Sequence, residues 1–283
     1  MKKIVIATRG SKLALIQAGL VADALHKQGV ETSLKIVMTK GDRLRESSLL
    51  VIGGNGLFVR EKERCLLSGE ADVAVHNGED LPGILSEGLM IGGMPEAETA
   101  ADCVLIRKEP VRVLGTGSAR REAECRKLYP EAEIVPAYGN IDTRLRKLRS
   151  GEFDGLVLSE AWVKRLGDPV SDLKIRRLSA AECMPAACQG ILAVECQSGD
   201  RKTAELLRKI THEPSRRRYV AERAMMRTLN ANFTMPVGVH ADVCGEALRI
   251  KALFRDRKAE ESGPFSEYPE ICRKLKKKLT RGL

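Results

Sequence analysis

Two arginines open a predicted helix directly after a Gly/Ser turn, an arrangement suited to binding an anion. Residues 111–121 read Val-Arg-Val-Leu-Gly-Thr-Gly-Ser-Ala-Arg-Arg, which predicts a strand, a turn and a helix beginning near Arg120 and Arg121. The first N–H groups of a helix lack backbone partners, and the helix dipole favours negative charge there. Each guanidinium can also grip a carboxylate or phosphate with a fork of N–H donors. We therefore expect this segment to bind an acidic group.

The start of the chain has the same pattern. Residues 4–7 read Ile-Val-Ile-Ala, which predicts a strand, and residues 8–11 read Thr-Arg-Gly-Ser. Ser11 is suited to capping the helix that follows. Two such elements indicate one acidic ligand that is held between two domains.

A carboxylate follows a third predicted strand. The apolar residues 71–76 lead into His76-Asn77-Gly78-Glu79-Asp80. Carboxylates just past the carboxyl end of a strand in an α/β sheet lie where such folds place ligands. The alternative is that Asp80 is a turn aspartate after Gly78. The four histidines show no ligand spacing, so we expect His76 to be a hydrogen-bonded core residue.

Composition limits the class of partner. The 283 residues suffice for two or three domains, and the formal net charge of +10 indicates an anionic partner. Aromatic residues make up only 4% and do not interleave with basic ones, which favours a small acid over nucleic acid. The eight cysteines form no C-x-x-C pair and have no zinc spacing, so we expect no metal site.

The opening apolar run ends after four residues, which is too short for a signal peptide, and no other run could cross a bilayer. We therefore expect a cytoplasmic protein with reduced thiols.

The elements that position these residues alternate between strand and helix, so we predict an α/β fold. Strands are predicted at 3–7, 33–39, 71–76, 103–107, 111–114, 133–136, 155–159, 191–196, 237–243 and 248–254. Helices are predicted after Ser11 and at 57–67, 118–128, 141–148, 161–166, 203–210, 215–229 and 267–279. The strand at 191–196 and the helix at 203–210 indicate a return of the chain to the first sheet.

Eight motifs resemble those of the porphobilinogen deaminase (hydroxymethylbilane synthase) family, in the same order and over nearly the whole chain. They are Ala7–Ser11, Gly53–Val59, Val75–Pro82, Gly115–Arg121, Gly139–Leu145, Lys164–Gly167, Pro185–Gly190 and Ala221–Met225.

The resemblance implies two lobes like those of a solute-binding protein, with mixed sheets, facing each other across a cleft, and a small C-terminal α+β domain. The expected bounds are 1–96 with 189–213, then 97–188, then 214–283. Such enzymes condense porphobilinogen head to tail into a linear tetrapyrrole and release ammonia. The chain grows on a dipyrromethane cofactor that a thioether joins to a cysteine of the third domain. We expect a monomer that binds a small acidic pyrrole or polycarboxylate.

The resemblance also implies roles for single residues. Asp80 stands at the position of the catalytic aspartate, which stabilises positive charge on the pyrrole N–H as ammonia leaves. The residues at carboxylate-binding positions are Arg9, Ser11, Thr116, Ser118, Arg120, Arg121, Arg144 and Arg165.

The chain departs from the family pattern at five positions. Phe233 stands where the attachment cysteine is expected, and phenylalanine cannot form a thioether. Trp162 replaces a glycine beside the cofactor. Asn55, Glu79 and Tyr138 replace cations, so three positive charges are lost and one negative charge is gained. Other thiols that could serve as the anchor are Cys183, Cys188 and Cys244.

Two hypotheses remain open at this point. The first is a divergent enzyme that anchors its primer at another residue or holds an oligopyrrole without a covalent bond. The second is a non-catalytic paralogue that binds a pyrrole, a tetrapyrrole or another small polycarboxylate.

Overall fold

The structure is a computed structural model that describes residues 3–39, 59–167, 170–232 and 235–282. The chain divides into two compact units. The first unit comprises Met1–Glu98 and Gly190–Arg216, and the second comprises Thr99–Gln189 and Arg217–Leu283.

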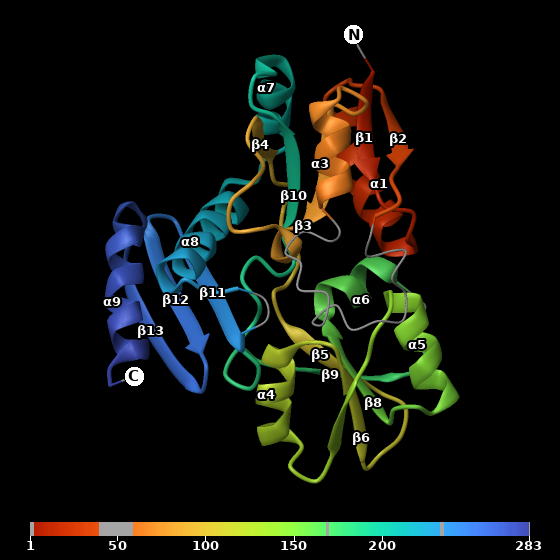
Figure 1. Cartoon of the computed structure of the whole chain (residues 1–283), viewed down its shortest axis with the longest axis vertical. Coiled ribbons are helices and arrows are strands. Elements are labelled where there is room, and N and C mark those ends of the chain that lie inside the picture. Colours follow the sequence, from red (N-terminus) through yellow and green to blue (C-terminus); the bar gives the residue numbers. More distant parts are fainter. Residues whose placement is uncertain (1–2, 40–58, 168–169, 233–234, 283) are drawn as a thin grey trace. The chain divides into compact units, whose positions relative to one another are not determined.

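The first unit is built on a five-stranded mixed sheet (Figure 1). Its strand order is β2 (Thr32–Ile36), β1 (Ile4–Thr8), β3 (Val73–Asn77), β10 (Leu192–Gln197) and β4 (Leu89–Gly93). β1 is parallel to β2 and β3, whereas β10 is antiparallel to β3 and β4. The predicted return of the chain to the first sheet is therefore confirmed, and the returning strand lies beside β3.

Helices cover both faces of this sheet. α1 (Lys12–His26) and α7 (Arg201–Lys209) pack on one face, in a cluster that includes Leu25, Val75 and Leu207. α3 (Arg60–Leu67) packs on the other face, where Leu66 contacts the cluster that contains Ala74. Side chains alternate along a strand, so His76 shares the α3 face with Ala74. The polar end of β3 is thus placed beneath α3.

The second unit contains another five-stranded mixed sheet. Its strand order is β7 (Glu133–Pro136), β6 (Val113–Thr116), β8 (Gly155–Ser159), β5 (Asp102–Ile106) and β9 (Lys174–Arg177). β6 is parallel to β7 and β8, and β5 is antiparallel to β8 and β9. The helices that accompany this sheet are α4 (Ala119–Leu128), α5 (Ile141–Ser150) and α6 (Glu160–Leu166).

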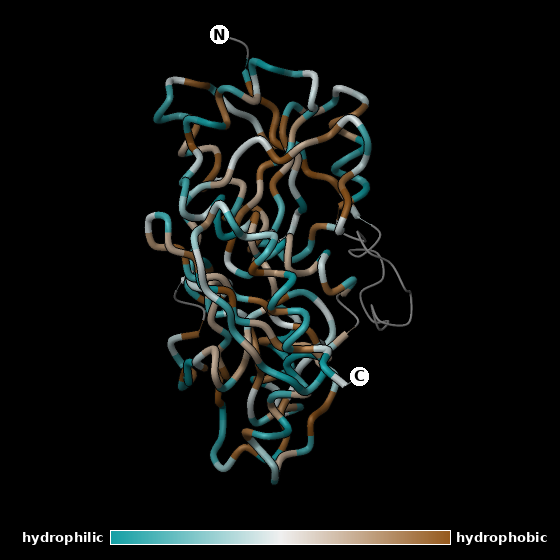
Figure 2. The backbone as a smooth tube through the Cα atoms, turned by 90° about the vertical axis from the view of Figure 1, so that its left-hand side faces the viewer, coloured by the Kyte–Doolittle hydropathy of each residue, from teal (hydrophilic) through white to brown (hydrophobic). Residues whose placement is uncertain are grey.

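A small antiparallel sheet ends the chain. It consists of β11 (Val237–Cys244), β12 (Ala247–Phe254) and β13 (Arg257–Pro264). α8 (Glu213–Leu229) and α9 (Tyr268–Thr280) close its core, in which Met225, Ile250 and Leu275 are fully buried. Hydrophobic and hydrophilic segments alternate along the backbone, and many of the outer turns are hydrophilic (Figure 2). The α/β class with two mixed sheets and a small α+β segment is as predicted.

Among the described strands, β4, β9 and β13 were not predicted, and all three lie at the edge of their sheets. β13 reads Arg-Lys-Ala-Glu-Glu-Ser-Gly-Pro, and every second residue is exposed. An edge strand is paired on one side only and is often rich in charged residues, which blocks further pairing. Because β13 contains only one apolar side chain before its proline, alternation of hydrophobic residues could not reveal it.

Candidate functional site

A small pocket lies in the first unit, beyond the carboxyl ends of β1 and β3. Its free volume is about 30 Å³. Its polar lining residues are Thr8, Arg9, Ser11, Gln17, Lys62, His76, Asn77 and Asp80. The pocket brings together Arg9, Ser11 and Asp80, which are the predicted site residues of this unit.

The Asp80 carboxylate is held by a chain of hydrogen bonds. Asp80 ends a single 3-10 turn (Gly78–Asp80) that directly follows β3. The Asn77 amide donates to its Oδ2 atom over 2.9 Å, and the Gln17 amide donates to Asn77 Oδ1 over 2.7 Å. The Gly78 N–H also donates to the Ile191 carbonyl over 2.8 Å, which fixes the turn to the neighbouring strand. The carboxylate therefore has a defined position in the pocket wall.

The turn from β1 to α1 is fixed by two side chains. Ser11 is the N-cap of α1, as predicted, and its hydroxyl accepts from the Ala14 N–H over 3.4 Å. The Thr8 hydroxyl donates to the Ala14 carbonyl over 3.1 Å. Half-buried Arg9 lies between these two residues, so the turn positions its guanidinium at the pocket.

Two residues that line the pocket, His76 and Lys62, are buried ionisable groups. His76 Nε2 lies 3.0 Å from Glu195 Oε2, so the expectation of a hydrogen-bonded core histidine is confirmed. Lys62, on α3, is only 4% exposed and donates to the Val75 carbonyl over 2.6 Å. Neither Lys62 nor Glu195 was predictable from the sequence, in which each is one charged residue among many.

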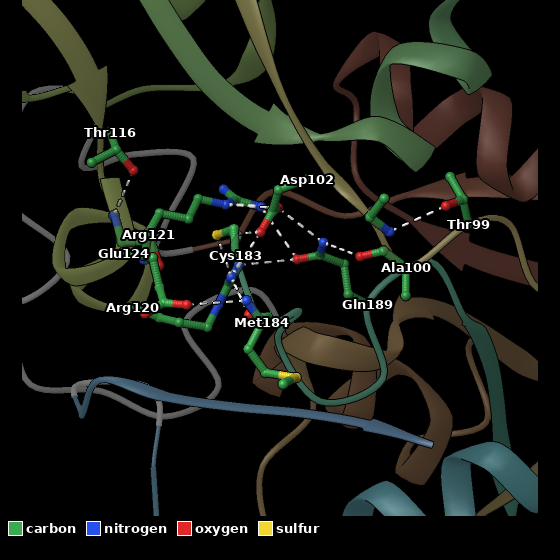
Figure 3. A network of polar contacts seen from close by, with 12 residues as sticks. Thr99, Ala100, Asp102, Thr116, Arg120, Arg121, Glu124, Cys183, Met184 and Gln189 are labelled. Atoms are coloured by element: carbon green, nitrogen blue, oxygen red, sulfur yellow. Dashed lines mark hydrogen bonds and ion pairs between the residues drawn. The ribbon is translucent and has the colours of Figure 1, made fainter. Parts of the chain in front are cut away.

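In the second unit, Arg120 and Arg121 point toward a single carboxylate, that of Asp102 (Figure 3). Arg120 Nη1 lies 2.7 Å from Asp102 Oδ2, and Arg121 Nε lies 2.9 Å from Oδ1. Asp102 is fully buried, and the two arginines are 3% and 7% exposed. Burial raises the pKa of Asp102, but the two guanidiniums outweigh that effect and hold its pKa at about 2.

Gln189 completes this network. Its amide nitrogen donates to Asp102 Oδ1 over 2.9 Å, and its oxygen accepts from both guanidiniums over 3.3 Å (Figure 3). Arg120 also donates to the Met184 carbonyl over 2.6 Å. The two arginines thus have internal partners that were not predicted from the sequence. Their predicted binding of ligand carboxylates stays a prediction.

The other predicted residues of the second unit lie at element ends. Ser118 caps α4 by accepting from the Arg121 N–H, and the Thr116 hydroxyl accepts from the Ser118 N–H. Arg144, on α5, is half-buried and donates to the Gly139 carbonyl over 2.8 Å. Arg165, on α6, is also half-buried.

Three of the five departures lie in described parts of the chain. Glu79, Tyr138 and Trp162 are half-buried, in the 3-10 turn, after β7 and on α6, respectively. Asn55 and Phe233 lie outside the described residues.

The described thiols do not fit a thioether at the loop that contains position 233. All eight cysteines are described, and only Cys244 is exposed. Cys244 ends β11, seven residues from the loop end of that strand, which is roughly 23 Å away at about 3.3 Å per residue. Cys183 and Cys188 are buried, and burial raises the pKa of the Cys183 thiol to about 12.

The described residues contain no group of three or more His, Cys, Asp or Glu side chains that could hold a metal ion. Among the described helices, none combines the length and apolar character needed to cross a membrane.

Comparison with known proteins gives family matches over both units. The model described as "Porphobilinogen deaminase, dipyromethane cofactor binding domain" matches residues 4–205, and "Porphobilinogen deaminase, C-terminal domain" matches residues 217–279. A porphobilinogen deaminase of Nitratidesulfovibrio vulgaris is 40% identical over 271 residues, which cover 92% of this chain and 85% of the relative. One of Streptococcus sanguinis is 38% identical over 274 residues, covering 93% and 88%.

Among solved structures, the periplasmic VFT2 domain of Bordetella pertussis BvgS matches with a TM-score of 0.42 and 15% identity. This match covers 74% of the chain and 85% of that domain.

Proposed function

We propose that the chain, which belongs to the porphobilinogen deaminase family, condenses porphobilinogen into a linear tetrapyrrole and releases ammonia. The observation that carries this proposal is the Asp80 carboxylate, fixed by Asn77 in a pocket that Arg9 also lines. A carboxylate and a cation at one pocket match a substrate that has both a pyrrole N–H and acid side chains.

Asp80 acts on the charge that develops during the reaction. When ammonia leaves the aminomethyl group, positive charge spreads over the pyrrole ring onto its N–H. A carboxylate held in advance stabilises this charge without having to reorganise, and such electrostatic stabilisation is usually the largest single contribution to catalysis. The hydrogen bonds from Asn77 and, through it, from Gln17 provide that advance positioning.

Arginines bind the acid side chains. A guanidinium can donate two parallel hydrogen bonds to one carboxylate, so Arg9 is suited to orienting the substrate at Asp80. In the second unit, two guanidiniums share the single Asp102 carboxylate, which leaves one positive charge uncompensated within that group of three. This excess supports the role of Arg120 and Arg121 in binding acid groups. We assign the same role to Arg144 and Arg165.

The family match includes the domain that binds the dipyrromethane cofactor. When bound, this group supplies the pyrrole carbon to which the first substrate is joined. Because the described thiols do not fit a thioether to it, the proposal includes no step on a cysteine-bound group. The alternative of a non-catalytic paralogue is not favoured by the comparisons.

The eight free thiols support a reducing, cytoplasmic location. A monomer that binds a small acidic pyrrole stays a prediction.

The proposal is tested by incubating the purified protein with porphobilinogen. We expect stoichiometric release of ammonia, four molecules for each linear tetrapyrrole. Spontaneous ring closure of the tetrapyrrole then gives a colourless porphyrinogen, which added iodine oxidises to a coloured porphyrin. Binding of porphobilinogen without ammonia release would instead support the non-catalytic alternative.

A further inference from the structure

Four ionisable side chains are buried together under α3, and the role proposed for Asp80 does not use them. They are Lys62 and Glu63 of α3, His76 of β3 and Glu195 of β10, each at most 4% exposed. Glu63 accepts from the Ser86 hydroxyl over 2.9 Å, and Lys62 donates to a backbone carbonyl. Within this cluster of four side chains, the pair of His76 and Glu195 has no evident structural role.

The two strands fix the geometry of this pair. His76 is opposite Ala193 in the antiparallel pairing of β3 and β10, and Glu195 lies two residues further along β10. Both side chains therefore point to the same face of the sheet, and their facing atoms, Nε2 and Oε2, are 3.0 Å apart.

The contacts described so far involve only the Nε2 atom of His76 and leave its other ring nitrogen, Nδ1, unexplained. Among the described residues, His76 Nδ1 has no hydrogen-bond partner, although the side chain is shielded from solvent. A buried polar atom without a partner destabilises the fold, so such atoms usually have a bound water or ligand. His76 also lines the pocket that contains Arg9 and Asp80. Its unpartnered nitrogen is therefore the one available to an occupant of that pocket.

The protonation of the pair determines what Nδ1 can offer. Burial and the nearby Lys62 lower the pKa of His76 well below 6.5, so its imidazole is neutral at pH 7. Burial and the nearby Glu63 raise the pKa of Glu195 to about 8, so its carboxyl is protonated at pH 7. The proton between the two groups then belongs to Glu195, which donates to His76 Nε2. The imidazole's own proton is on Nδ1, which makes that atom a donor.

We propose that His76 is a further substrate-binding residue, whose Nδ1–H donates to a carboxylate oxygen of the substrate at the pocket of Arg9 and Asp80. Glu195 is the positioning residue that holds the imidazole. The partner is an acid side chain rather than the pyrrole N–H, because two donors cannot pair with each other. This inference rests on the proposed function, since the acid groups are those of porphobilinogen.

Two substitutions at His76 separate substrate binding from a purely structural role. His76→Asn places an amide nitrogen near the position of Nδ1 and loses the contact with Glu195. His76→Gln places an amide near the position of Nε2, keeps the contact with Glu195 and loses Nδ1. We expect His76→Gln to raise the KM for porphobilinogen about tenfold with kcat changed less than about threefold, and His76→Asn to raise KM less. If the order of the two KM values is reversed, or neither changes, His76 is a structural residue and the inference is wrong.

If the His76 variants fold poorly, the variant Glu195→Gln still tests the positioning role of Glu195. Its amide N–H can donate to Nε2 as the protonated carboxyl does, and this hydrogen bond does not depend on pH. Above pH 8 the wild-type carboxyl loses its proton, the imidazole proton moves to Nε2, and KM is expected to rise about tenfold. The other charged groups facing the pair, Lys62 and Glu63, are unchanged by this substitution.

In Glu195→Gln the rise in KM above pH 8 should disappear. The same rise in both proteins would overturn the inference. A wild-type protein that releases no ammonia from porphobilinogen would overturn the proposed function instead, so the two failures are distinguishable.

Discussion

The Asn77 amide donates a 2.9 Å hydrogen bond to the Asp80 carboxylate, and the two residues lie on either side of the end of β3. Asn77 is in turn held by Gln17 of α1, over 2.7 Å. A helix and a strand that are far apart in sequence thus determine where one carboxylate lies. We infer that the reaction depends on this placement as well as on the charge of Asp80.

Asn77→Ala is therefore expected to lower kcat by about tenfold to a hundredfold, because a hydrogen bond to a charged group contributes about 1.5–3 kcal/mol. The measurement is the initial rate of ammonia release at saturating porphobilinogen. Gln28→Ala, at an exposed position after α1, is the control and should leave the rate unchanged. Equal rates for the two variants would show that Asp80 needs no support from Asn77.

Asp102→Asn is expected to destabilise the second unit. The substitution removes the charge that Arg120 and Arg121 share and leaves two buried guanidiniums without a counter-ion, a change that costs about 3–5 kcal/mol. Urea unfolding, followed by circular dichroism, measures this loss. Asp172→Asn is a matched control, because Asp172 pairs with Arg149 at the surface. A similar small loss in both variants would contradict the structural importance of the Asp102 network.

The pKa of Asp102 also predicts acid sensitivity. Its folded-state pKa of about 2 is below the ordinary 3.8, so its contribution to stability is present above pH 3.8 and is lost as pH falls toward 2. The free energy of unfolding of the wild type should therefore fall more steeply than that of Asp102→Asn over this range. Parallel curves for the two proteins would disprove this assignment.

The raised pKa of Glu195 predicts that its contribution to the free energy of unfolding depends on pH in the opposite direction to that of Asp102. Its folded-state pKa of about 8 is above the ordinary 4.5, so its neutral form stabilises the fold fully below pH 4.5, and this contribution is lost as pH rises toward 8. Urea unfolding at pH 5 to 8 should show a wild-type stability that decreases with pH. In Glu195→Gln this decrease should be smaller. An unchanged slope would mean that Glu195 is ionised in the folded protein.

Mass spectrometry of the denatured protein tests the assignment of the thiols. We expect the mass of the bare 31.1 kDa chain, because seven cysteines are buried and Cys244 is at the far end of β11 from the loop of the third domain. A heavier species that survives denaturation would contradict this, and peptide mapping would then identify the modified residue. Cys244→Ser would show whether the exposed thiol is responsible.

Local features of the site were predictable from the sequence, whereas its long-range partners were not. Ser11 was identified as a helix cap because an N-cap is a local pattern of one polar residue before an amphipathic segment. Ser118 was expected to bind a carboxylate, and its role as the N-cap of α4 was not predicted. Asp102 was missed as the partner of Arg120 because 18 residues of chain separate the two, and only the sheet brings them together. Glu195 was missed for the same reason, since it lies 119 residues from His76.

The central claim is that the Asp80 carboxylate stabilises positive charge as ammonia leaves the substrate. The most direct measurement is kcat for ammonia release by Asp80→Asn, which keeps the shape of the side chain and removes its charge. Asp23→Asn, at an exposed position on α1, serves as the control. Because Asp80→Asn removes the one charge aimed at the developing positive charge, we expect its kcat to fall about a hundredfold to a thousandfold. The kcat of the control should not change. A kcat within about twofold of the wild type in a folded Asp80→Asn protein would contradict the claim.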